Sequence, residues 1–231
     1  MTDAPAGTSS YQPAQAEPLD LELLHHRRYD VQAYRKSDDR LVLRGTVIDE
    51  KPPGVYFATD PDPLTVHHMV LDVTVAFPSL EIVEAELVMR THPHEECTRI
   101  EEKYGLLVGL SIARGFTHKI RELFGGPRGC THTTALLQAM APVAIQSTWS
   151  MRALSETEQF GAPPLGKSPT QEELNARFAF NLNTCHVWAE DGDLIEAIKR
   201  GEDHGPPLWA IERSKELGID PDDWRLGSER D

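Results

Sequence analysis

The segment GGPRGCTHTTALLQ, residues 125–138, places a thiol and an imidazole two residues apart where an apolar run begins. Its glycines and proline favour a tight bend, and the apolar run indicates a helix that starts just after the bend. Free amides at a helix start favour a thiolate over a thiol, and they also bind carboxylates and phosphates. Cys130 could therefore be a nucleophile or a metal ligand, and His132 could transfer protons near neutral pH.

Three neighbours of this pair are predicted to hold a substrate. Arg128 supplies positive charge, and the backbone at Gly129 and Thr131 supplies amide donors for a carboxylate or a developing anion. The alternative interpretation is structural: a small buried cysteine at a helix start, with His132 satisfied by a backbone carbonyl.

A second cluster, RTHPHEEC at residues 90–97, follows a strand-like run. Its histidines and its cysteine are groups that zinc or iron binds, and His94 and Cys97 are also predicted to act in catalysis. The alternative is a polar loop with Cys97 packed at the base of a helix. If this loop and the first cluster meet in space, the predicted metal-binding set combines residues of both: Cys97, Cys130, His132 and His92.

Two further pairs of neighbouring residues carry weaker signals. Cys185 and His186 are adjacent, and adjacent residues on a strand point to opposite faces, so we expect a core cysteine there rather than a shared pocket. His67 and His68 are also adjacent, so on a strand they point to opposite faces. At most one of them is expected to face the side covered by helices, where a core histidine with a satisfied partner is the simpler interpretation.

The elements that must position these residues follow from the periodicity of the apolar side chains. Residues 29–90 alternate apolar and polar positions and predict up to four largely antiparallel strands, with turn chemistry at residues 37–39. Pro142 is expected to kink or break the helix that contains it. Helical patterns occur over residues 95–104, 112–123, 130–154, 168–180, 193–200 and 208–217. Strands before helices predict an α+β fold: an N-terminal antiparallel sheet of three to four strands, with helices packed on one face.

Length and composition suit one globular domain. The 231 residues are predicted to form a disordered tail over 1–24, a single α+β domain over 25–220 and a polar tail over 221–231. A formal net charge of −14 argues against nucleic acid and anionic membrane as partners, so a small-molecule substrate is expected. The sequence has no glycine-rich nucleotide loop, and we therefore expect no nucleotide cofactor. Three widely spaced cysteines and no secretion signal favour reduced thiols and the cytoplasm.

The runs HRRYDVQAYRKSDDRLVLRGTVIDEKP, HPHEECTRI, GGPRGCTHTTALLQ and NTCHVW together resemble a bacterial family known as domain of unknown function 2889. The likeness covers most of residues 26–190 and rests on Gly129–His132, on Cys97 and on Leu107–Gly115. It implies a site at these residues and an association with the breakdown of aromatic compounds, but it implies no reaction. Thr133 stands where the family commonly has leucine, a difference that mainly affects packing.

A second likeness, of layout alone, is to iron–sulfur cluster scaffold proteins. These proteins place antiparallel strands before helices, with one cysteine after the last strand and another at the start of a later helix. Cys97 and Cys130 are similarly placed, but residues 30–90 lack the further cysteine that the scaffold pattern has between its early strands. This departure weakens the implied role in cluster building.

These observations favour an enzyme with lyase or hydrolase chemistry on a small anionic substrate, which the family likeness suggests is aromatic. Zinc or iron is the cofactor that the Cys and His residues could hold, in which case a metal-bound water would take over the acid–base work. The competing function is a non-enzymatic metal, iron–sulfur or sulfur carrier or scaffold. A third is a structural or regulatory domain in which the cysteines are inert.

Overall fold

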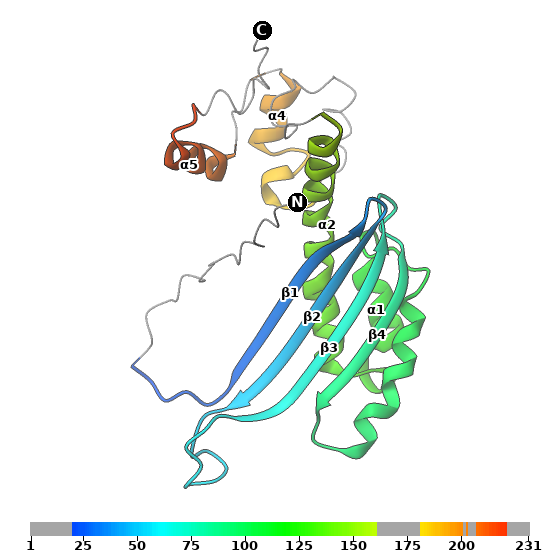
Figure 1. The fold of residues 1–231 in the computed structure, drawn as a ribbon, viewed down its shortest axis with the longest axis vertical. Helices are drawn as coiled ribbons and strands as arrows, with labels where there is room; N and C mark the ends of the chain where they lie inside the picture. Colours follow the sequence, from blue (N-terminus) through cyan, green and yellow to red (C-terminus); the bar gives the residue numbers. More distant parts are fainter. Residues whose placement is uncertain (1–19, 161–180, 201, 203–206, 221–231) are drawn as a thin grey trace, which may run out of the picture.

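A four-stranded antiparallel sheet forms the N-terminal half of the computed structural model, which describes residues 20–160, 181–200, 202 and 207–220. Its strands lie side by side in chain order and form one twisted layer (Figure 1). They are β1 (His26–Ser37), β2 (Arg40–Lys51), β3 (Leu64–Ala76) and β4 (Ile82–Thr91). The predicted N-terminal antiparallel sheet of an α+β fold is confirmed, and the turn between β1 and β2 falls at the predicted residues.

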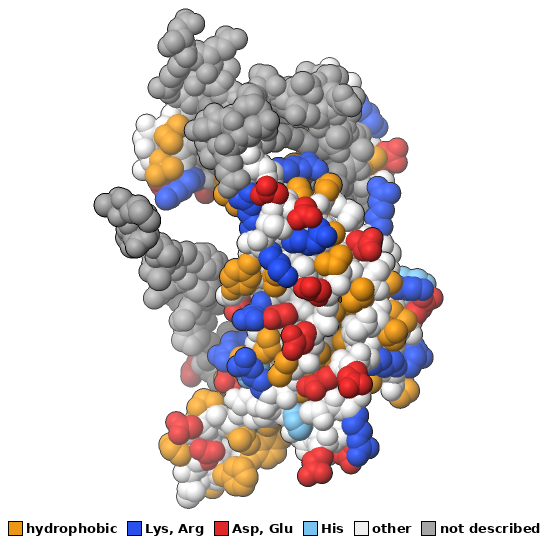
Figure 2. All heavy atoms as spheres, turned by 45° about the vertical axis from the view of Figure 1, so that its right-hand side comes forward, with side chains coloured by type: hydrophobic (Ala, Val, Ile, Leu, Met, Phe, Trp, Pro, Cys, Tyr) orange, Lys and Arg blue, Asp and Glu red, His pale blue; other side chains and the backbone are white. Residues whose placement is uncertain are grey.

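One face of the sheet is buried and the other is polar. Leu43, Val47 and Leu71 lie on the buried face at the predicted alternation. On the opposite face, Arg44 of β2 donates two hydrogen bonds to Asp72 of β3 across the strands. Figure 2 shows acidic and basic side chains intermixed on the surface of the molecule. The alternation therefore separates a face for helix packing from a face for solvent.

The helices that follow the sheet cover its buried face (Figure 1). They are the 3₁₀ helix η1 (Glu95–Leu107), α1 (Phe116–Phe124), the 3₁₀ turn η2 (Gly126–Arg128) and α2 (Thr131–Phe160). The short helix expected over residues 95–104 is thus a 3₁₀ helix. The helix expected from residue 112 begins only at Phe116, because Gly115 has a left-handed conformation with φ 70°. Ile112 is nevertheless fully buried, which explains its apparent helical spacing.

Helix α2 lies close to the sheet and positions the residues at its start. Pro142 was expected to kink or break this helix, and of these two outcomes the break does not occur, since α2 continues through the proline. Leu137, Met140 and Ala144 are fully buried on both sides of the proline, so packing holds the helix although one hydrogen bond is lost. Gly45 of β2 allows the close approach, because a Cβ there would lie 2.6 Å from Sδ of Met140.

The C-terminal helices lie at the other end of α2, far from its first residues (Figure 1). They are η4 (His186–Trp188), α4 (Asp193–Lys199) and α5 (Leu208–Leu217), and the last two confirm the helices predicted there. The helix predicted over 168–180 and the tail predicted over 221–231 lie outside the described residues, as does most of the predicted tail 1–24. The domain limits stay a prediction. Within the described part of the chain, no helix combines the length and apolarity needed to cross a membrane.

Candidate functional site

A pocket of about 350 Å³ opens where the start of α2 meets β3, β4 and η1. Both predicted clusters contribute to it, so the two cysteine-bearing segments do meet in space. Its walls combine sulfur and imidazole groups with apolar side chains. The lining residues are His67, Met69, Met89, Pro93, Glu96, Cys97, Ile100, Gly129, Cys130, Thr131 and His132.

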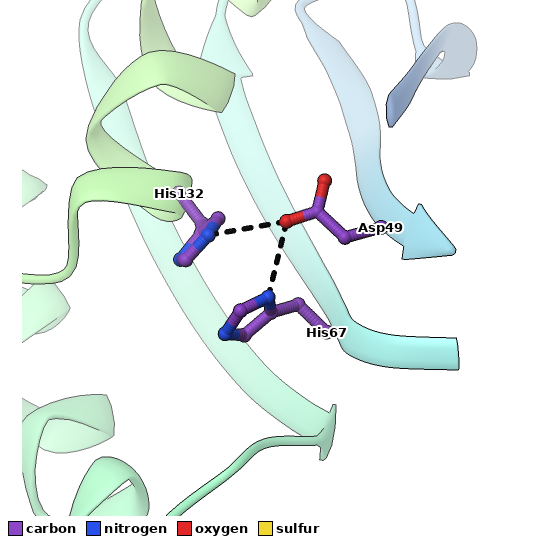
Figure 3. A group of neighbouring side chains, drawn as sticks. All are labelled: Asp49, His67 and His132. Carbon is purple, nitrogen blue, oxygen red and sulfur yellow. Dashed lines mark hydrogen bonds and ion pairs between the residues drawn. The ribbon is translucent and has the colours of Figure 1, made fainter. Parts of the chain in front are cut away.

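Asp49 links the polar residues at one side of this pocket (Figure 3). Its side chain is 1% exposed and lies near the end of β2. Arg27 of β1 donates to both carboxylate oxygens, Nε to Oδ1 at 2.5 Å and Nη2 to Oδ2 at 2.7 Å. Two histidines share Oδ2: Nδ1 of His67 lies 3.0 Å from it and Nε2 of His132 lies 3.2 Å from it. A third, His25, places Nε2 3.3 Å from Oδ1.

The charges at this cluster fix its protonation near neutral pH. Burial opposes ionisation of Asp49, but the hydrogen bonds and positive charge of Arg27 outweigh it and lower the pKa of the carboxyl to about 2. Burial lowers the pKa of His132, and the charge of Arg27 lowers it further. Burial and the nearby His132 likewise lower the pKa of His67. We therefore describe His67 and His132 as neutral imidazoles beside an arginine–carboxylate pair.

The ionised carboxylate sets the tautomer of each imidazole. A carboxylate only accepts hydrogen bonds, so the ring nitrogen that faces Asp49 must carry the proton. His132 is then protonated at Nε2, and its Nδ1 is a free acceptor. Sγ of Cys130 lies 3.6 Å from that Nδ1, so the thiol can donate its proton there. Cys130, His132 and Asp49 thus form a line of nucleophile, base and orienting carboxylate.

The start of α2 holds Cys130 in place. The backbone amide of Cys130 donates to Oη of Tyr104 at 3.0 Å, and the buried Tyr104 ring stacks on Phe124 with ring centroids 4.5 Å apart. Gly129 is required because a Cβ there would lie 2.6 Å from the carbonyl oxygen of Phe124. The amide of Thr134 donates to the Cys130 carbonyl at 2.9 Å. The amides of residues 131–133 therefore lie in the first turn, where the helix itself offers them no acceptor.

The structure brings together some of the residues predicted from the sequence and leaves others apart. Cys97, Gly129 and Thr131 line the pocket with Cys130 and His132. The other predicted residues, His92, His94 and Arg128, are not among its lining residues.

The three outlying residues have other contacts. Nδ1 of His92 faces the carbonyl of His94 at 2.9 Å, within their own turn. The Arg128 guanidinium donates to the carbonyls of Glu122 (2.8 Å) and Arg121 (3.2 Å) at the end of α1. Arg128 therefore caps α1 rather than facing a substrate.

Cys185 and His186 do not join this site. Cys185 is exposed, so the expectation of a core cysteine is wrong. The segment forms the 3₁₀ turn η4 instead of a strand, and His186 is exposed as well. The sequence pattern misled because a turn at the surface and a strand in the core can carry the same short run of residues.

The described residues contain one group of three potential metal ligands whose atoms all lie within 4.8 Å of one another: Asp49, His67 and His132. Only His132 belongs to the set predicted from the sequence. Two histidines and one carboxylate are ligands that iron and zinc accept. Arg27 already contacts both oxygens of Asp49, and its positive charge opposes a cation there.

Asp49 and Arg27 were not proposed for the site from the sequence, and His67 was expected at most as a core histidine with a satisfied partner. Two of these three residues nevertheless carry a signal. Asp49 is in phase with the buried Leu43 and Val47 of the same strand, which places a carboxylate on the helix side of the sheet. His67 is likewise in phase with the buried residues of β3. A charged group at a core position needs a partner, and that need could have drawn attention to both.

A comparison with protein families gives one match. The model of the family described as "Protein of unknown function (DUF2889)" matches residues 25–146, which is more than half of the chain. The chain belongs to this family. The matched stretch contains Asp49, His67, Cys130 and His132, whereas Cys185 lies beyond it. No curated protein and no solved structure matches the chain.

Proposed function

We propose that this protein is a cysteine hydrolase that cleaves a small ester or thioester through Cys130. The observation that carries the proposal is the line of contacts from Sγ of Cys130 to Nδ1 of His132 (3.6 Å) and from Nε2 of His132 to Oδ2 of Asp49 (3.2 Å). A nucleophile, a base and a group that orients the base, in this order, are the signature of an activated nucleophile. Of the lyase and hydrolase chemistry expected from the sequence, this line favours hydrolysis.

The first half of the reaction uses groups that already face one another. His132 takes the thiol proton at Nδ1 as Sγ attacks the carbonyl carbon, and the bond to the leaving group breaks as His132 returns the proton to it. Asp49 stabilises the imidazolium that forms in between. The free first-turn amides of α2 are suited to the negative charge that develops on the carbonyl oxygen. The products are the free leaving group and an acyl thioester on Cys130.

The lining of the pocket favours an apolar acyl group. Met69, Met89 and Ile100 form its apolar wall, and methionine sulfur packs well against aromatic rings. An aromatic acyl group, in keeping with the breakdown of aromatic compounds, is therefore our proposed substrate type. A negative charge on the substrate would be held by the start of α2, because Arg128 caps α1. A free nucleophilic thiol works in a reducing compartment, so the cytoplasm is the proposed location.

A second candidate function is metal-assisted hydrolysis at Asp49, His67 and His132. It is favoured by the spacing of their ligand atoms, all within 4.8 Å. A bound zinc or iron would supply a Lewis acid or an activated water. Arg27 would have to leave Asp49 to admit the ion, and for this reason we rank the metal site below the cysteine mechanism. A carrier or scaffold role for a metal or cluster would use the same ligands without turnover.

The hydrolase proposal is tested with p-nitrophenyl butyrate, an activated ester with a short apolar acyl group. The full-length protein is mixed with the ester, p-nitrophenolate release is followed, and acid-quenched samples are mapped by mass spectrometry. We expect a butyryl adduct on Cys130, and a Cys130→Ala variant should lose about 10⁴-fold in rate. Cys185→Ala is the matched control and should hydrolyse the ester like the unaltered protein.

Two outcomes would contradict the proposal. Hydrolysis that persists in Cys130→Ala, or an adduct found only on Cys97, would show that Cys130 is not the nucleophile. Activity lost with a chelator and restored by zinc or iron would favour the metal site instead. Metal or cluster bound in stoichiometric amount, with no ester turnover, would favour the carrier.

A further inference from the structure

His67 is a polar residue of the pocket that the acylation step does not use. It comes from β3, and its side chain is 20% exposed, so it is accessible from the pocket that it lines. Its Nδ1 lies 3.0 Å from Oδ2 of Asp49, the same oxygen that His132 faces. Figure 3 shows the two rings on one side of this carboxylate, arriving from different elements.

The shared carboxylate fixes the two rings in opposite tautomers. His132 is protonated at Nε2 and presents Nδ1, whereas His67 is protonated at Nδ1 and presents Nε2. Nδ1 of His132 faces the thiol of Cys130. Nε2 of His67 points away from Asp49 and has no hydrogen-bond partner among the residues that the structure describes (Figure 3). The site therefore contains a second oriented base that is not used by the nucleophile.

The two rings also constrain the order of events. Their centroids are 4.0 Å apart with planes inclined by 32°. Two imidazolium charges at this separation would repel each other strongly, so only one ring can hold a proton at a time. A hydrolase of this type has two successive proton transfers, one in acylation and one in deacylation, which is compatible with this restriction.

From this geometry we infer that His67 is the general base of deacylation, an inference that rests on the proposed cysteine hydrolase. Nε2 of His67 takes a proton from a water molecule as the water oxygen attacks the acyl carbon on Cys130. The C–S bond breaks, the acyl group leaves as a carboxylic acid, and Cys130 leaves as a thiolate. The proton on His67 then returns to the Cys130 thiolate through solvent, which restores the thiol for the next turnover. Water is the acceptor, so the reaction is hydrolysis rather than transfer to a second substrate.

The test separates the two steps in a His67→Asn variant. The asparagine amide can donate to Asp49 from the position of Nδ1, but it has no base at the position of Nε2. With p-nitrophenyl butyrate, we expect a burst of p-nitrophenolate at the rate of the unaltered protein, followed by turnover that is about 10²-fold slower. The butyryl thioester on Cys130 should accumulate and be visible by mass spectrometry.

Hydroxylamine provides a readout that a merely structural role would not change. This strong nucleophile attacks a thioester without a general base, so it should restore turnover in His67→Asn. His186→Asn, which changes an exposed histidine outside the pocket, is the matched control and should show no accumulation.

The inference is overturned if His67→Asn slows the burst and the steady state equally, or if hydroxylamine gives no rescue. Either result would mean that His67 only supports the structure of the site. These outcomes differ from failure of the proposed function, in which the unaltered protein gives no Cys130 adduct at all. A melting curve of His67→Asn like that of the unaltered protein shows that the variant is folded. A folded His67→Asn that deacylates at the rate of the unaltered protein also overturns the inference.

Discussion

The protein contains two Cys–His pairs that look alike in the sequence and differ completely in their surroundings. Cys130 and His132 lie at the start of α2 and line a pocket, and His132 is oriented by the buried Asp49. His186 begins the turn η4, which Cys185 directly precedes, and this turn lies at the other end of α2 (Figure 1). Both side chains are exposed. The difference shows that a thiol next to an imidazole is not a site by itself. What makes it one is a third residue, brought from a distant strand.

Among the changes that test this comparison, removing that third residue should have the largest effect. Asp49→Asn replaces an acceptor by an amide that can donate, which favours the wrong tautomer of His132 and should lower ester hydrolysis by about 10³- to 10⁴-fold. Asp72→Asn is the matched control, because Asp72 also pairs with an arginine but lies on the opposite face of the sheet. Steady-state kinetics on both variants is the measurement. Equal rates in the two variants would remove Asp49 from the mechanism.

A smaller effect is expected in the pH dependence. Burial and the charge of Arg27 lower the pKa of His132 below the usual histidine value of 6.5. Because His132 then stays neutral to a lower pH, the acidic limb of the kcat/KM profile should have its midpoint below pH 6.5. Arg27→Met removes the positive charge and leaves the negative charge of Asp49. The pKa of His132 should therefore rise, and the acidic limb should move to higher pH. Arg27→Lys keeps a positive charge and should move the limb less. A limb that stays in place in Arg27→Met would contradict this electrostatic account.

The free energy of unfolding should also decrease as the pH falls. A histidine whose pKa is lower in the folded state binds fewer protons there than in the unfolded chain. Both His67 and His132 are of this kind, so their contribution is complete above pH 6.5 and is lost as the pH falls through their lowered values.

The fold was largely predictable because it follows local patterns. Alternation along the strands predicted the sheet, and the glycines before Cys130 predicted the helix start. Pro142, which was expected to kink or break its helix, does not break it, because burial of Met140 and Ala144 on either side of it outweighs one missing hydrogen bond. Local sequence cannot report such long-range packing.

The proposed nucleophile and base could be predicted from the sequence, but the carboxylate beside them could not. Cys130, His132 and Cys97 all line the pocket. Asp49 comes within reach of His132 only through strand pairing and the close approach of α2 over Gly45. His94 was expected beside them, yet its turn directs it to the surface. Spacing along the chain shows which residues are near in sequence, whereas register and packing decide which of them meet.

The most direct test of the central claim is the alkylation rate of individual cysteines. Iodoacetamide is added to the folded protein at pH 7, and modification of Cys130 and Cys185 is followed by peptide mass spectrometry. We predict that Cys130 reacts at least about tenfold faster than Cys185, although it is the less exposed of the two. His132→Gln, which can still donate to Asp49 but has no base to take the thiol proton, should abolish that advantage. A Cys130 that reacts no faster than Cys185, or that keeps its rate in His132→Gln, would contradict the account.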